Sequence, residues 1–177
     1  VSEGAGNQVV VELPDPATMA GFDTLELDLS LTCQGAGEVG YCPAWDRNVF
    51  LWHCETVDAT TCEDQIGHWI TTYHREGRWV HDVSGLLPLL DSGGPHKFAF
   101  SVQDPWEVTM SLRLSDQAKP LRPSECHTLY RGRSVDFNPT YNDAFPDVDL
   151  DIPADAVQVE LLTSITGHGM SNPGNCA

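Results

Sequence analysis

Basic residues are scarce in this chain. Nine lysine and arginine residues stand against 26 aspartate and glutamate residues, which gives a formal net charge of −17 over 177 residues. Nucleic-acid binding requires clustered basic side chains that neutralise phosphates, and binding to an anionic membrane surface requires the same. The composition therefore predicts no nucleic-acid partner and no membrane partner. We take solubility as the simplest reason for the acidity.

Long apolar runs are lacking as well. No run approaches the ~18 residues of a membrane-spanning helix, and residues 1–13 carry no signal-peptide pattern. Hydrophobic residues still make up 41% of the chain and aromatic residues 8%, which is enough to build a core. The sequence predicts a globular protein, with any export signal already removed.

Helical periodicity is almost absent. Only Ser84 to Leu90 looks helical, and Pro88 limits it to a turn or two. The dominant pattern is a period of two, typical of strands with one buried face, and turn residues punctuate it at the spacing of a β-sandwich. We therefore predict an all-β fold with strands at 9–13, 25–31, 49–53, 66–73, 80–83, 98–102 and 108–114.

The period-two alternation stops after Ser115, and we take this position as a domain boundary. Residues 116–135 show no period and are predicted to be a linker. Beyond them, residues 148–152 alternate with aspartates, and residues 157–165 have the pattern of another strand. We predict one sandwich in residues 1–115 and the start of a second in residues 136–177. The second would have too few strands to cover its own apolar face, so more chain is expected naturally.

Six cysteines without a C-x-x-C pair favour disulfides over zinc. Cys126 and Cys176 are left to pair with each other or with chain not present here. The cysteine content predicts an oxidising compartment, either secreted or periplasmic. Two local bridges are predicted across turn-rich segments: Cys33–Cys42 and Cys54–Cys62.

One short stretch carries the functional interest. Trp45, Asp46 and Arg47 follow a cysteine and a proline and precede a predicted strand. Asp46 is therefore expected at the edge of a rigid sheet, where a loop presents a reactive side chain. Trp45 would offer a surface for a sugar or apolar ring, and Arg47 a fixed cation that tunes the acid. This combination suits hydrolysis of a sugar-linked bond.

The same stretch, read with three others, resembles the peptide:N-glycosidase F family. The Cys-Pro-x-Trp-Asp-Arg run is similar to a motif in the first domain of that family. The match covers about residues 33–114 well and the tail in fragments. The other similar segments are Ile66–Tyr73, His81–Ser84 with the Leu86–Leu87 turn, and the late Gly167–His168 and Asn175–Ala177.

The resemblance implies two adjacent jelly rolls and an amidase. Its substrate would be the bond between asparagine and the first N-acetylglucosamine of an N-linked glycan, carried on a glycosylated peptide or protein. Asp46 falls on the main catalytic aspartate of the family and Arg47 on the neighbouring arginine, while Trp45 falls on the flanking aromatic. No cofactor and no metal are implied. The remaining expected site residues are Asp104 as a second acid, with Trp106 and His168 in substrate binding.

The sequence also departs from the family. Asp104 stands where the family has a glutamate, and Pro105 follows it. The next family acid comes after Cys-Ala, where this chain ends at Ala177, so a missing C-terminal portion is an expected partner. A non-catalytic module that binds a glycan or a protein is therefore a rival, because a lost acid ends catalysis but not stacking. A copper-dependent monooxygenase shares the scaffold, but no H-x-H pair occurs here, and the scattered histidines favour surface or structural roles.

Overall fold

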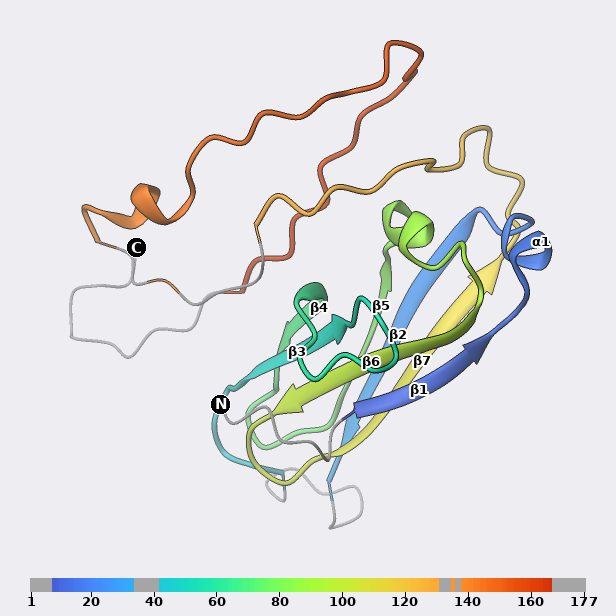
Figure 1. Cartoon of the computed structure of the whole chain (residues 1–177). Coiled ribbons are helices and arrows are strands. Elements are labelled where there is room, and N and C mark those ends of the chain that lie inside the picture. Colours follow the sequence, from blue (N-terminus) through green and yellow to red (C-terminus); the bar gives the residue numbers. More distant parts are fainter. Residues whose placement is uncertain (1–7, 34–41, 131–134, 136–137, 167–177) are drawn as a thin grey trace.

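The computed structural model of the chain describes residues 8–33, 42–130, 135 and 138–166. Within these residues, two antiparallel sheets pack face to face, which confirms the predicted all-β class (Figure 1). One sheet has the strand order β1-β6-β3-β4 and the other β5-β2-β7. The elements are β1 (Gln8–Leu13), α1 (Pro16–Met19), β2 (Thr24–Thr32), β3 (Asn48–His53), β4 (Asp64–Ile70), β5 (Gly77–Asp82), η2 (Ser84–Leu89), β6 (Gly94–Val102), β7 (Glu107–Ser115) and η3 (Tyr141–Ala144).

Strand β2 forms the centre of the core. Its four alternate leucines, from Leu25 to Leu31, are at most 1% exposed, because β2 lies between β5 and β7 and faces the other sheet. The polar residues between them point outward, where Asp28 accepts hydrogen bonds from Arg78 on β5. The alternation in this strand therefore separates core from surface as the sequence predicts.

Both predicted disulfides are present. Cys33 is bonded to Cys42 with its Cα atoms 5.4 Å apart, and Cys54 to Cys62 at 4.1 Å. Two bridges of this kind fit an oxidising, non-cytoplasmic compartment. Cys126 is a free thiol in the described part of the chain, and burial raises its pKa; Cys176 lies outside that part. No helix among the described residues has the length and apolar character needed to cross a bilayer.

Helical structure is sparse, as predicted. The segment expected to turn, Ser84 to Leu90, forms the 3-10 helix η2, and Pro88 lies inside it. Helix α1 was not predicted. Its signal is present in the sequence, since the side chain of Asp15 caps the N–H groups of Ala17 and Thr18 and a proline opens the helix.

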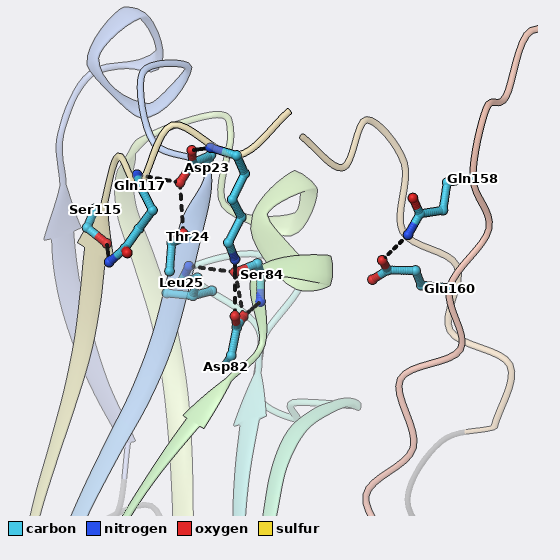
Figure 2. Close-up of polar contacts among 10 residues, drawn as sticks. Asp23, Thr24, Leu25, Asp82, Ser84, Ser115, Gln117, Gln158 and Glu160 are labelled. Carbon is cyan, nitrogen blue, oxygen red and sulfur yellow. Dashed lines mark hydrogen bonds and ion pairs between the residues drawn. The ribbon is translucent and has the colours of Figure 1, made fainter. Parts of the chain in front are cut away.

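The chain after β7 is fastened to the sandwich at a buried carboxylate. Asp23, 7% exposed, accepts hydrogen bonds from the backbone N–H groups of Gln117 and Lys119 and from the hydroxyl of Thr24 (Figure 2). Burial raises the pKa of Asp23, but these hydrogen bonds outweigh it and lower the pKa to about 2. Farther on, the Arg122 guanidinium forms an ion pair with Asp91. The predicted linker is thus held in place where it begins.

Residues 116–166 otherwise form no strand in their described parts, only the short helix η3. They add no strand to the sandwich, and the last part runs back toward it (Figure 1), where Ser164 and Thr166 form hydrogen bonds with His68 on β4. The segments 148–152 and 157–165 have the alternation of strands, but they form no strand pair with any other described residue. A strand needs a partner for its backbone hydrogen bonds, so alternation alone did not produce one. The second sandwich stays a prediction, since part of residues 136–177 lies outside the described structure.

Candidate functional site at the end of the sandwich

The stretch from Trp45 to Arg47 lies at one end of the sandwich. The pairing register places the end of β2, the start of β3 and the end of β4 at this end, together with the turn between β6 and β7. Asn48 pairs with Ile70, and Val49 pairs with Val102. Segments far apart in sequence therefore meet next to Asp46.

Thr71 holds this loop to the end of β4. Its hydroxyl accepts a hydrogen bond from the backbone N–H of Arg47 at 2.8 Å and donates one to the carbonyl oxygen of Trp45 at 3.1 Å. The backbone N–H of Thr71 also donates to the Arg47 carbonyl at 2.9 Å. Because Thr71 is only 2% exposed, water competes poorly for these bonds. The Cys33–Cys42 bridge fixes the other side of the loop to the end of β2.

Arg47 joins the loop to the turn between β6 and β7. Its Nε donates to Oδ2 of Asp104 at 3.3 Å, and both side chains are about one-third exposed. Asp104 has a φ of 68°, a left-handed conformation that costs energy in a non-glycine residue and is found more often at functional sites. The structure thus brings together two predicted site residues that are 57 positions apart.

Asp46 is half-buried and contacts a residue that the sequence reading did not select. Tyr73 donates a hydrogen bond to the Asp46 carboxylate, and this bond raises the pKa of the Tyr73 phenol, with burial and the charge of Asp46 adding to it. Asp46 is therefore oriented by a phenol that is itself 52% exposed. The carboxylate remains close to solvent and is not enclosed in the core.

The two predicted stacking residues differ in their surroundings. Trp45 is 62% exposed and offers its indole to solvent. Trp106 is partly buried, and its indole N–H has no hydrogen-bond acceptor among the described residues. It lines a cavity of about 460 Å³ between β1, β6 and β7, and Asp104 lies in the same lining. The third predicted substrate-binding residue, His168, falls outside the described residues.

The described residues contain no group of three or more side chains that could hold a metal ion. Two histidines do pair: Nε2 of His53 lies 2.9 Å from Nδ1 of His96, and both residues are buried. Burial lowers the pKa of each imidazole, and His96 lowers that of His53 further. The pair lies on the core side of β3 and β6, where the ring of His53 packs against Phe98.

No protein-family model and no curated protein matches the chain.

Two residues of the site, Thr71 and Tyr73, could not be selected from the sequence. The alternation predicts a strand that continues to Tyr73, whereas β4 ends at Ile70. The chain turns there because Thr71 bonds to the loop and no longer to β3. The one available signal was the consecutive threonines after Ile70, since threonine hydroxyls bond to nearby backbone groups at strand ends.

Proposed function

We propose that this site hydrolyses the amide bond between asparagine and the first sugar of an N-linked glycan. The observation that carries the proposal is the Arg47–Asp104 ion pair, which lies beside Asp46 at the end of the sandwich. Arg47 is next to Asp46 in the sequence, and the ion pair brings it next to Asp104 in the folded chain. Amide hydrolysis needs these elements: a base for the water, a positive group for the oxyanion, and a proton for the leaving nitrogen.

The roles follow from the contacts. Asp46, oriented by Tyr73, accepts a proton from a water that attacks the amide carbonyl carbon. Arg47 stabilises the negative charge that develops on the carbonyl oxygen. The carbon–nitrogen bond then breaks, the nitrogen takes up a proton and leaves as a glycosylamine, and the peptide keeps an aspartate. The proton that Asp46 took from the water passes to that nitrogen, and Asp104 holds the Arg47 guanidinium in place through the ion pair.

Substrate binding follows from the exposed aromatic surface. Trp45 presents its face to solvent, and aromatic faces stack on the apolar faces of sugar rings while their N–H groups seek acceptors. Trp106 lines the cavity that also contains Asp104, and we assign it to the wall of the substrate site. The partner of the site is a glycosylated peptide or protein.

The proposal includes the wider architecture that the resemblance implies. The sandwich of residues 8–115 would be a jelly roll, and residues 136–177 would open a second one that completes the cleft. Secretion or a periplasmic location fits an enzyme that acts on glycoproteins, and the two disulfides support it.

Release of glycan from a denatured glycopeptide tests the proposal. We expect free glycan together with conversion of asparagine to aspartate, read by mass spectrometry. Asp46→Asn should lower the rate by about 10²–10⁴-fold, the usual contribution of a positioned base. Asp58→Asn is the matched control, because Asp58 is an exposed acid in the loop closed by Cys54 and Cys62. Equal rates for the two variants would refute the role of Asp46.

One observation favours the rival function, a module that binds a glycan without cleaving it. Both acids of the site already have partners, Asp104 in its ion pair and Asp46 with Tyr73, as purely structural acids would. A chain that binds the glycopeptide, loses binding in Trp45→Ala and releases no glycan would establish this rival in place of the amidase.

A further inference from the structure

The most exposed apolar side chains of the described chain lie in the extended segment after the turn at residues 153–156. Val157, Val159 and Leu161 are 81%, 66% and 74% exposed. They alternate with Gln158 and Glu160, so in an extended chain they share one face. Among the described residues, no strand pairs with this segment. An unpaired strand with one apolar face is a template for the addition of another strand.

This segment is self-complementary under a two-fold axis. If two copies pair antiparallel about Val159, then Val157 lies opposite Leu161 and Gln158 lies opposite Glu160. Within one chain, the Gln158 amide already donates to the Glu160 carboxylate (Figure 2), and the two-fold pairing allows the same bond between copies. Every apolar side chain then meets an apolar one, and no charge faces a like charge.

The preceding segment does not have this property. In residues 147–152 every second residue is an aspartate. Any antiparallel self-pairing that keeps the apolar face together places aspartates opposite aspartates, which is destabilising. The two described segments of similar pattern therefore differ in what they can pair with, and only residues 157–161 suit a second copy.

We propose that residues 157–161 form the two-fold contact of a homodimer through antiparallel strand pairing. Such a contact is isologous, with the same five residues on both sides. It is also small, below the roughly 1,200 Å² of a standard interface, so dimerisation is weak and depends on protein concentration. The dimer does not rest on the proposed amidase function, and it holds equally for a binding module. Within the proposed second sandwich it requires residues 157–161 to be an edge strand.

Cysteine cross-linking tests the register. The background is the full chain with Cys126→Ser and Cys176→Ser. Val159→Cys should cross-link with itself, because residues directly opposite in an antiparallel pair have Cα atoms about 4.5–5.5 Å apart, within disulfide range. Val157→Cys alone should not, since its two copies would be about 13 Å apart along the strand. An equal mixture of Val157→Cys and Leu161→Cys chains should form the mixed dimer.

Sedimentation velocity provides a second measurement that needs no oxidation. In about 0.5 M salt, which screens the repulsion between two acidic chains, the natural chain should shift from monomer to dimer as concentration rises. Val159→Asp should weaken association by about tenfold or more. Val148→Asp is the matched control, a valine 45% exposed in the preceding segment, and it should leave the dimer unchanged.

Three results would overturn the proposal. The first is a natural chain that stays monomeric up to a protein concentration of about 1 mM. The dissociation constant of any dimer would then lie above about 1 mM, which is too weak for specific binding. The second is a loss of the dimer in Val148→Asp equal to that in Val159→Asp. The third is cross-linking of Val157→Cys alone as efficiently as in the mixture with Leu161→Cys.

Discussion

Replacement of Thr71 by valine should detach the loop that carries Trp45 and Arg47 from β4. Valine keeps the shape of threonine but removes the hydroxyl that bonds to Arg47 and Trp45. Each lost hydrogen bond is worth about 0.5–1.5 kcal/mol, and a poorly solvated backbone group left unpaired costs about 1–3 kcal/mol. The bond from the Thr71 N–H to the Arg47 carbonyl remains and limits the loss. We expect the free energy of unfolding to fall by about 2 kcal/mol.

Two measurements check this expectation. Urea denaturation should show a lower midpoint with an unchanged m-value, because the surface exposed on unfolding stays the same. Thr109→Val, an exposed strand threonine on β7, should leave the midpoint within about 0.5 kcal/mol. Hydrogen exchange at the Arg47 amide should be roughly 30-fold faster in Thr71→Val, which corresponds to about 2 kcal/mol. Unchanged exchange at Arg47 would show that Thr71 does not hold the loop.

Three further outcomes are expected. Gly67→Ala places a Cβ atom 2.2 Å from the indole of Trp69, so it should lower the free energy of unfolding by about 1–3 kcal/mol. Urea denaturation checks this loss, and a shift of the tryptophan emission spectrum checks the displaced indole. Because the pKa values of His53 and His96 are lowered in the fold, the unfolded chain takes up protons first, and stability should fall as pH drops below about 6.5; His53→Gln should flatten that slope in urea titrations. The lowered pKa of Asp23, about 2 against an ordinary 3.8, adds stability above pH 3.8 that is lost toward pH 2; a variant Asp23→Asn with an unaltered acid profile would contradict this.

The strands were predictable because their residues alternate strictly. Residues 25–31 and 108–114 were placed within one residue of the ends of β2 and β7, since every second side chain is a large apolar one. Strand β5 was predicted three residues short. Its first two residues, Gly77 and Arg78, have no apolar side chain. The ring of Trp79 packs over Gly77, a contact that no periodicity reveals.

The site was only partly predictable. Asp46 and Arg47 were selected as neighbours in sequence, and Asp104 through a resemblance. The contacts of these residues depend on the sheet register, which brings distant turns together. Tyr73 follows a strand end, and His96 lies 43 positions from His53. Long-range contacts of this kind leave no local pattern, because only the folded chain brings such partners together.

The hydrogen bonds to Asp23 also decide where a shortened chain could safely end. Truncation at Ser115, where β7 ends, would remove the N–H groups of Gln117 and Lys119. The Asp23 carboxylate would then be buried without two of its hydrogen-bond donors, and a buried charge that lacks such partners destabilises the fold. A boundary just after Arg122 keeps these donors and the ion pair with Asp91, so the minimal sandwich for expression extends past its last strand.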